Sequence, residues 1–471
     1  MMQFTTDGIK SFKDLVVGIH RVMVEGMEKA LQTVIDQLDD ELPHPGPGWE
    51  SVGKKARSLN TLFGMELCIR RRGFRRRDPS AGGDQEQKEL YFPLDEALGL
   101  PREERFCPLV QQLGVMLATE LSFRGAAGLL RSVFSVPVSH QQVHRWAQEA
   151  GEEREQEVAG KVAAAFAEGQ EVAAGEKVAP TVVVEADGVW VRLQREQQRS
   201  LEWKLGIVHA GWEAESPAGK QMRLIDQACW GGTLTTEAFW ERGVVTLAEQ
   251  YAFPSIQRVV RSGDGAAWIK AGQEHLRPAE FYLDPYHRNQ ALLRGLGHDR
   301  ALLKEAEAAL EGEEWERLDA LLQRAALTAP HPKAKERAQE ARRYLQANWE
   351  GLGDWRKRPG PQPPGAKQLG TMESQVRHIA AARMKRRGAS WGKVGANNMI
   401  QLRLLGHTGE LHNWLDRRGA QRSEAMVRRR GRHERSRVIE RLRKERTLRH
   451  GCVRAFPSCR PKRPVPLWVG P

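Results

Sequence analysis

Three acidic signatures, far apart in the chain, carry residue types suited to metal-dependent chemistry. They are residues 182–188 (Val-Val-Val-Glu-Ala-Asp-Gly), 259–265 (Val-Val-Arg-Ser-Gly-Asp-Gly) and 372–374 (Met-Glu-Ser). The first two read as β-branched strands that each present an aspartate at a break or end, and the third lies on a helical pattern. Carboxylates gathered from distant segments favour Mg²⁺ or Mn²⁺, because hard cations prefer oxygen ligands.

The order of these acids is more informative than any one of them. An Asp-Gly after a strand is most often a turn, and Asp264 could simply cap the following helix. Together, Asp187 on the first strand, Asp264 after the fourth and Glu373 on a later helix could meet at one edge of a sheet. Three carboxylates there repel one another unless cations bridge them. We therefore expect two ions about 4 Å apart, with Asp187 bridging both, Asp264 holding one and Glu373 the other.

Two further groups lie close to these acids in sequence. Glu185 is on the same strand face as Asp187 and could be a substitute ligand or an exposed acid. Asp187 is favoured because it adjoins the break at Gly188. Asp284 and His287 form an Asp-x-x-His pair after a later strand, for which a helix cap and a core histidine are the simpler explanation.

The elements that must position these acids follow the order of a ribonuclease-H-like core. Strands are predicted at residues 181–193, 201–210, 222–229, 256–260 and 280–283. Helices are predicted near 235–249 and around Trp268. The expected fold class is α/β: a mixed sheet whose second strand is antiparallel to its neighbours and whose later strands are parallel to the first. An all-helical insertion interrupts this core, and a helical helix-turn-helix region precedes it.

The same patterns divide the chain into regions. These are an N-terminal helix with a small basic extended region (1–105), a helix-turn-helix DNA-binding region (106–158), the ribonuclease-H-like core (176–287 and 371–410), a helical insertion and linker (288–370), and a basic C-terminal tail (411–471).

In the helix-turn-helix, Ser139 begins a capping box with Gln142. The apolar side chains expected to face inward are Val143, Trp146, Ala147 and Ala150. The polar side chains expected to face outward, toward base edges and phosphates, are Gln141, His144, Arg145 and Gln148. A helical hairpin with a polar outer face, without DNA contact, is the alternative.

The charge of the chain favours a polyanionic partner. Net charge is +13 with pI near 9.6. No apolar run is long enough to span a bilayer, and the N-terminus lacks the apolar core of a signal peptide. The five cysteines are scattered and form no CxxC pair, so we expect reduced thiols, no zinc site and a cytoplasmic, nucleoid-associated protein.

Basic side chains gather in three places. Residues 70–77 hold six arginines around Phe74, namely Arg70, Arg71, Arg72, Arg75, Arg76 and Arg77. They could clamp a phosphate backbone, or form a solvated hairpin edge that prevents edge pairing. Arg377, one turn after Glu373, could pair with it or contact a phosphate, as could Lys385. The arginine-rich tail is either solvated or a nonspecific DNA contact.

With these residues the chain resembles bacterial insertion-sequence transposases of the ISLre type, which are related to Mutator-like enzymes of the DDE class. The matching stretches are 94–100, 185–188 (Glu-Ala-Asp-Gly), 263–270 (Gly-Asp-Gly-Ala-Ala-Trp-Ile-Lys), 283–287 (Leu-Asp-Pro-Tyr-His), Glu373, 383–385 (Arg-Met-Lys) and 390–391 (Ser-Trp). The resemblance covers nearly everything from about residue 10 to 410, and the stretch from 263 to 270 is its most specific part.

The resemblance implies a ribonuclease-H-like transposase that cuts the ends of its own mobile element and joins them to new DNA. It implies that Asp187, Asp264 and Glu373 are the acidic triad, and that Asp284 and His287 fall on the Asp/Cys-x-x-His motif of the Mutator relatives. Synapsis of two ends makes a homodimer or larger assembly on DNA an expectation. Two alternatives remain: an inactive DNA-binding protein derived from a transposase, and a ribonuclease-H-like nuclease or resolvase.

Overall fold

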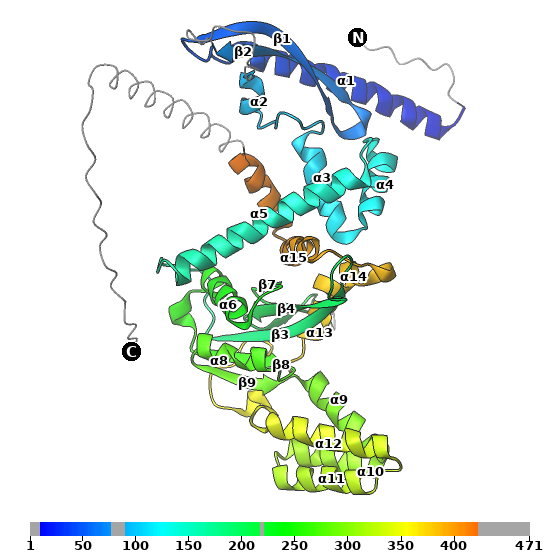
Figure 1. Cartoon of the computed structure of the whole chain (residues 1–471), viewed down its shortest axis with the longest axis vertical. Helices are drawn as coiled ribbons and strands as arrows, with labels where there is room; N and C mark the ends of the chain where they lie inside the picture. Colours follow the sequence, from blue (N-terminus) through cyan, green and yellow to red (C-terminus); the bar gives the residue numbers. More distant parts are fainter. Residues whose placement is uncertain (1–9, 77–89, 217–220, 423–471) are drawn as a thin grey trace, which may run out of the picture. The chain divides into compact units, whose positions relative to one another are not determined.

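The structure is a computed structural model that describes residues 10–76, 90–216 and 221–422 (Figure 1). Most of the predicted basic tail, from residue 423 on, lies outside the described residues, as does Arg77. The chain forms two compact units. Within the described residues, the larger comprises 10–32, 57–69, 105–216 and 221–416, and the smaller comprises 33–56, 70–76, 90–104 and 417–422.

A mixed five-stranded sheet is the centre of the larger unit (Figure 1). Its order in space is β7-β4-β3-β8-β9. Strand β4 is antiparallel to β3 and β7, whereas β8 and β9 run parallel to β3. The predicted α/β class and strand directions are therefore confirmed. The strands are β3 (Thr181–Arg192), β4 (Ser200–His209), β7 (Ala228–Gly232), β8 (Arg258–Gly263) and β9 (Ala279–Leu283).

The predicted third strand, residues 222–229, is wrong as a single element. Its first part, β6 (Met222–Leu224), pairs with β5 (Trp212–Ala214) in a separate two-stranded sheet. Its second part begins β7. The chain turns between them at Asp226, which has φ +50 and whose carbonyl oxygen accepts hydrogen bonds from Tyr251 and Gln250.

Both faces of β3 are covered. Val182, Val184 and Ala186 pack beneath helices α6 (Thr236–Gln250), α7 (Ala267–Lys270) and α8 (Gly272–His275). Val183, on the opposite face, packs against residues of the segment that returns from the insertion. Burial on both sides explains why the apolar run at the start of this strand is nearly continuous rather than alternating.

The helices before the sheet are α3 (Pro108–Glu120), α4 (Phe123–Phe134) and α5 (His140–Phe166). Ser139 Oγ accepts from the Gln142 amide at 3.1 Å, as predicted, but the Gln142 side chain accepts from Arg145 instead of completing the capping box. Ser122 caps α4 in the same way, its Oγ accepting from the Gly125 amide at 3.1 Å. Ser135 ends α4 in the left-handed conformation, with φ +54. Trp146 and the other apolar residues predicted to face inward are buried.

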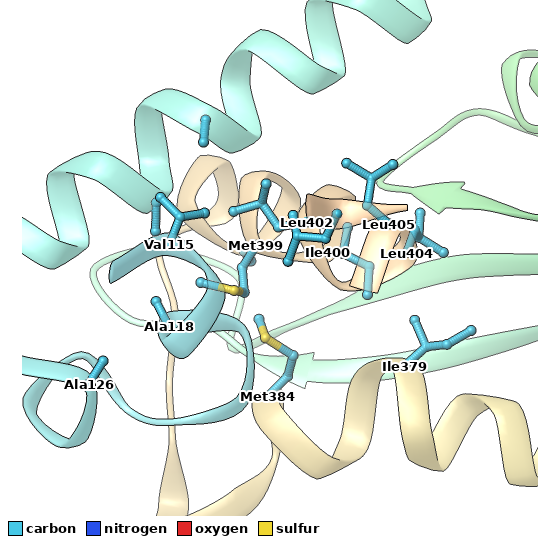
Figure 2. Close-up of a cluster of buried hydrophobic side chains, with 14 of the residues drawn as sticks. Val115, Ala118, Ala126, Ile379, Met384, Met399, Ile400, Leu402, Leu404 and Leu405 are labelled. Atoms are coloured by element: carbon cyan, nitrogen blue, oxygen red, sulfur yellow. The ribbon is translucent and has the colours of Figure 1, made fainter. Parts of the chain in front are cut away.

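Helix α15 (Lys393–His407) packs across α5. The two helices approach most closely at Gly151, where a Cβ atom would overlap the backbone of Asn398. Figure 2 shows part of the apolar cluster that α15 shares with α3 and with the segment around Ile379 and Met384. This cluster makes the helix-turn-helix region and the sheet one compact unit.

The helical region between β9 and the last part of the core has an apolar core of its own. It consists of α9 (Pro285–Leu296), α10 (Arg300–Glu311), α11 (Trp315–Leu327) and α12 (Pro332–Ala347), followed by short 3₁₀ turns at Trp349–Gly351 and Trp355–Lys357. The proline-rich segment then returns along the sheet, where the Pro361 carbonyl accepts from Thr181 Oγ1 at 2.7 Å. The Pro364 carbonyl accepts from the Trp212 amide at 3.0 Å.

The remaining elements are shorter or lie near the N-terminus. They are α1 (Phe12–Glu41), β1 (Trp49–Asn60), β2 (Glu66–Arg76), α2 (Pro93–Ala97), the 3₁₀ turns Leu62–Gly64 and Phe253–Ser255, α13 (Met372–Val376), a π-helical turn (Arg377–Ala381), α14 (Ala382–Met384) and a 3₁₀ turn (Arg386–Gly388). Strands β1 and β2 form a two-stranded sheet. Across the described ranges, no helix combines the length and the apolar character needed to cross a membrane.

Candidate functional site

Three aspartates lie at the same level across three neighbouring strands, Asp264 and Asp284 just after the ends of β8 and β9 and Asp187 within β3. The predicted break at Gly188 is wrong, because β3 continues through it to Arg192 and stays paired with β4. The pairing of β3 with β8 ends two residues before Asp187 and Asp264. The pairing of β8 with β9 ends one residue before Asp264 and Asp284, and the Asp284 amide donates to the Gly263 carbonyl at 2.8 Å. Register therefore aligns Asp187, Asp264 and Asp284 across three neighbouring parallel strands.

Asp187 is held in an environment that opposes its ionisation. Its side chain is largely buried, and its Oδ1 accepts a hydrogen bond from the Gly188 amide at 2.7 Å. Burial raises the pKa of Asp187 to about 6, and the negative charges of Asp264 and Asp284 add to the increase, whereas the Gly188 amide and His287 oppose it. A bound cation would relieve this cost by favouring the charged carboxylate.

Asp264 lies at a sharp turn, where hydrogen bonds hold both its side chain and its backbone carbonyl. Its Oδ1 accepts from the Ala266 amide at 2.8 Å, and its carbonyl oxygen accepts from the Tyr344 hydroxyl of α12 at 2.6 Å. The next residue, Gly265, has φ +83, and a Cβ there would overlap the Asn348 side chain. Only glycine fits this turn without strain, because the helical insertion packs directly against it. The packing of the insertion therefore explains why glycine follows Asp264.

Asp284 and His287 form a coupled pair beside the other two aspartates. Asp284 is buried and caps α9 by accepting from the amides of Tyr286 at 2.8 Å and His287 at 3.2 Å. The predicted helix cap is thus confirmed. His287 is not a core residue, because its ring is half-buried with Nδ1 3.4 Å from Asp284 Oδ1. Asp284, and then Asp187 and Asp264, raise the pKa of His287.

Glu185 is neither an exposed acid nor a free ligand, so both predictions for it are wrong. Its fully buried carboxylate accepts from the Gly370 amide at 3.0 Å, the Met372 amide at 3.2 Å and the Thr371 hydroxyl. The Nε2 atom of buried His209 lies 3.7 Å away. Glu185 therefore anchors the start of α13 to β3. A lone glutamate within a buried valine run was the sequence signal for such a role.

Glu373 lies in the first turn of α13 and is exposed. The segment just before it approaches the aspartates: Gly370 has φ +112, and a Cβ there would lie 3.3 Å from Asp284 Oδ2. The structure thus brings the start of the Glu373 helix beside Asp284 and joins it to the strand of Asp187.

The aspartates supply the oxygen donors that Mg²⁺ takes, and the raised pKa of Asp187 marks a site where positive charge would be stabilised. In the conformation described for residues 10–76, 90–216 and 221–422, however, no three His, Cys, Asp or Glu side chains are gathered closely enough to hold a metal ion. The residue types and their placement fit a hard cation, and holding one would require the carboxylates to turn toward each other.

The helix that begins with α13 and carries Glu373 does not keep one hydrogen-bonding pattern along its length. It changes to a π-helical turn at Arg377–Ala381 and resumes as the short α14. Within this part of the structure, Glu373 and Arg377 form no ion pair with each other. Their α-helical spacing is intact, because the Arg377 amide donates to the Glu373 carbonyl. Arg377 and Lys385 are both exposed.

The outward face of α5 differs from expectation at one position. Gln141, His144 and Arg145 are exposed, as predicted. Gln148 is instead half-buried, and its side-chain and backbone oxygens accept from Asn398 Nδ2 of α15 at 3.2 and 3.3 Å. Its side chain therefore holds the α5–α15 contact rather than facing outward.

The arginines of β2 are largely committed to internal partners, which corrects the predicted phosphate clamp. Arg71 is buried, lies 2.7 Å from Asp95 and stacks over Phe92. The other internal partners are Asp39 and the Leu42 carbonyl for Arg72, and Glu50 for Arg75. Phe74 is buried against His44 and cannot stack on a base. Arg70 is exposed and Arg76 is half-exposed.

Comparison with known proteins places the whole described core in one family. The profile of the "Uncharacterised protein family (UPF0236)" matches residues 4–418. A protein of Streptococcus gallolyticus, named "UPF0236 protein in vanSb 3'region", is 26% identical over 400 residues, covering 83% of this chain and 82% of its own length. Two UPF0236 proteins of Caldanaerobacter subterraneus subsp. tengcongensis are 24% and 23% identical over 416 and 384 residues. The first alignment covers 87% of this chain and 81% of the relative, and the second covers 81% of this chain and 74% of the relative.

Proposed function

The chain belongs to the UPF0236 family of uncharacterised proteins, and from this premise we propose that it is a DDE transposase of the ISLre type. It cuts the ends of its own insertion sequence and joins them to new DNA. The observation that carries this proposal is the alignment of Asp187 and Asp264 on neighbouring parallel strands, with the Glu373 helix anchored to the first of them.

The strand order supports the proposed class of fold. Three strands in an antiparallel meander, followed by two strands parallel to the first, form the order β7-β4-β3-β8-β9. This is the arrangement expected of a ribonuclease-H-like core, in which acids at the strand ends converge with an acid from a later helix. Fold alone does not determine activity, so the acids carry the argument.

The names of two relatives add independent support. One Caldanaerobacter name joins eleven locus designations and another joins four, so closely matching proteins are encoded at many places in one genome. An element that moves by transposition leaves such copies. Applied to this chain, the repeated loci favour a mobile-element protein over a single-copy nuclease.

The chemistry assigned to the site is phosphodiester transfer. Two bound Mg²⁺ or Mn²⁺ ions would activate the attacking oxygen and stabilise the departing one. Asp187 would hold both ions, Asp264 one and Glu373 the other. A water oxygen forms the new bond to phosphorus and the bond to the 3′ oxygen breaks, which frees a 3′-hydroxyl. That hydroxyl then attacks a phosphodiester of the target strand and displaces its 3′ oxygen.

DNA is the proposed partner, bound by a homodimer or larger assembly that brings two element ends together. Among the described residues, the side chains available for contact are Gln141, His144 and Arg145 on α5, Arg377 and Lys385 after Glu373, and the exposed Arg70 with half-exposed Arg76. Phosphate contacts by such residues make affinity fall steeply as salt is added.

Replacing Asp264 with Ala is expected to abolish cleavage and joining while leaving binding of the element ends intact. The assay uses full-length protein, Mg²⁺ or Mn²⁺, and DNA carrying the sequences that flank the gene. Asp299→Ala is the matched control, because Asp299 Oδ1 accepts a comparable capping bond from the Ala301 amide at 2.9 Å, within the insertion.

Each other outcome has a distinct meaning. If Asp264→Ala still joins ends, the catalytic assignment is wrong. Wild-type protein that binds ends but never cleaves them with either metal is a DNA-binding derivative of a transposase. Cleavage of branched DNA without joining identifies a resolvase.

Replacing Arg71 with Ala is expected to lower stability rather than DNA affinity. The buried carboxylate of Asp95 would lose its partner at 2.7 Å, a loss that typically costs about 3–5 kcal/mol. Urea unfolding measures the first effect, and the dependence of DNA affinity on salt measures the second. Arg70→Ala is the exposed control. An unchanged stability together with a shallower salt dependence for Arg71→Ala would restore the phosphate-clamp interpretation.

A further inference from the structure

The carboxyl end of α3 is capped by two arginines from distant parts of the chain. The last carbonyl groups of a helix lack partners within the helix and must find them elsewhere. Arg383 Nε donates to the Ala118 carbonyl at 2.9 Å. Arg403 Nη1 donates to the Thr119 carbonyl at 3.1 Å and also contacts the Glu120 carboxylate.

The same Arg403 side chain holds the π-helical turn that follows Glu373. Its Nε donates to the Ile379 carbonyl at 2.9 Å, and its Nη2 donates to the His378 carbonyl. A π-helical turn shifts its hydrogen bonds by one residue relative to an α-helix, so neighbouring carbonyls must be satisfied from outside. One guanidinium, 7% exposed, thus joins α3 to the segment after Glu373.

The environment of these arginines makes the arrangement specific. Arg383 is 8% exposed, and its guanidinium lies over the rings of both Phe123 and Trp391, 5.1 and 4.9 Å from their centres. Burial and, to a smaller extent, the charge of the nearby Arg403 together lower the pKa of Arg383 to about 10. Two neighbouring buried cations are costly unless their hydrogen bonds are satisfied, so the acceptors must stay in place.

Buried apolar side chains pack around these bonds. Ile379, Met384 and Met399 are fully buried, and Figure 2 shows them in the cluster that also includes Ala118 of α3. Loss of the Arg403 guanidinium would therefore leave carbonyls of the π-helical turn without hydrogen-bond donors in an apolar environment.

We propose that Arg403 is a positioning residue, which fixes the π-helical turn after Glu373 to the carboxyl end of α3. Because α3 leads directly into α4 and α5, the helices proposed to hold DNA and the segment carrying the third acid form one rigid assembly. The second half of this inference, the effect on catalysis, rests on the proposed function; the structural half does not.

The first test is amide hydrogen exchange of the full-length protein. In Arg403→Met, amides of residues 376–384 should exchange at least tenfold faster than in wild type, with β3 and β8 unchanged. Arg242→Met is the matched control, because this buried arginine joins Glu155 of α5 to the Gly231 carbonyl without touching α13. Unchanged exchange at 376–384 would overturn the proposal.

Arg403→Lys keeps the positive charge but not the planar fork, so a single ammonium cannot reach both sets of carbonyls. Hydrogen exchange of this variant provides the same test if Arg403→Met does not fold. We expect faster exchange at 376–384 in this variant too, and wild-type exchange would contradict the two-sided bridge.

The second test separates catalysis from binding. Arg403→Lys should lower kcat for strand cleavage at least tenfold while KM for the DNA end changes less than twofold. A loss confined to KM would overturn the positioning role. If wild-type protein never cleaves DNA, the proposed function fails, whereas the exchange result still decides whether Arg403 fixes the turn.

Discussion

Asp187→Asn is expected to abolish the proposed strand cleavage and, at the same time, to raise the free energy of unfolding of the metal-free protein at pH 7.5. Such opposite effects are expected where a functional carboxylate is held charged in an unfavourable environment. The asparagine keeps an oxygen that can accept the Gly188 amide, so the local turn is preserved. It cannot carry the negative charge that a bridging metal ligand needs.

The sign of the stability effect follows from the pKa of Asp187, which rises from 3.8 to about 6 in the folded protein. The folded state then binds more protons than the unfolded chain between these values. The contribution of Asp187 to stability is therefore most favourable below pH 4 and declines as pH rises through 6. The full cost is at most about 3 kcal/mol, reduced by solvent screening because the side chain is partly exposed.

Urea unfolding in EDTA at pH 4 and pH 7.5 measures this effect. The free energy of unfolding of Asp187→Asn should exceed that of wild type by more at pH 7.5 than at pH 4. For the control Asp299→Asn, the difference from wild type should not change between these pH values. Added Mg²⁺ should stabilise wild type but not Asp187→Asn, because a cation that binds the folded state shifts the equilibrium. An asparagine variant that is less stable than wild type at pH 7.5 would contradict the argument.

Glu185→Ala is expected to lower the free energy of unfolding by about 3 kcal/mol or more. The substitution removes the acceptor of the buried Met372 amide and of two partly buried donors, the Gly370 amide and the Thr371 hydroxyl, and unsatisfied buried donors cost about 1–3 kcal/mol each. It also frees the start of α13, so cleavage should fall even under conditions in which the variant remains folded. Glu373 would then lose its connection to β3.

Glu185→Gln separates shape from charge. The amide fills the same space and retains one acceptor oxygen, but its NH₂ group faces the donors of residues 370–372, so an intermediate loss of stability is expected. Glu213→Ala is the control, since this carboxylate pairs with Arg223 at 2.8 Å and both side chains are exposed, so its loss should cost less. If Glu185→Ala costs under 1 kcal/mol, the anchor is not this carboxylate.

The sheet could be predicted because its strands have recognisable local sequence patterns. The starts of β3 and β8 are buried valine-containing runs, and Asp187 and Asp264 follow where the parallel pairing stops. Their alignment is a direct consequence of strand order. The split of the third strand was not predictable, because Asp226 turns the chain without the usual glycine.

Other parts depended on partners far away in the sequence. Arg71 and Arg72 look like free positive charge until Asp95 and Asp39 are brought to them. The π-helical turn has an ordinary helical composition, and what stabilises it is Arg403, 24 residues after Ile379. Local patterns identify elements and their ends, whereas the use made of a charged side chain depends on tertiary contacts.

The strand register that aligns the aspartates also determines where this protein tolerates editing for laboratory use. Adding or deleting one residue in 181–187, 258–264 or 279–284 would turn the acids to the wrong face of the sheet. The hairpin tip at 194–199 is exposed and lies beyond the paired residues of β3 and β4. A fluorophore or short peptide tag can be inserted there without altering the spacing of the acids, because exposed loop tips absorb added length.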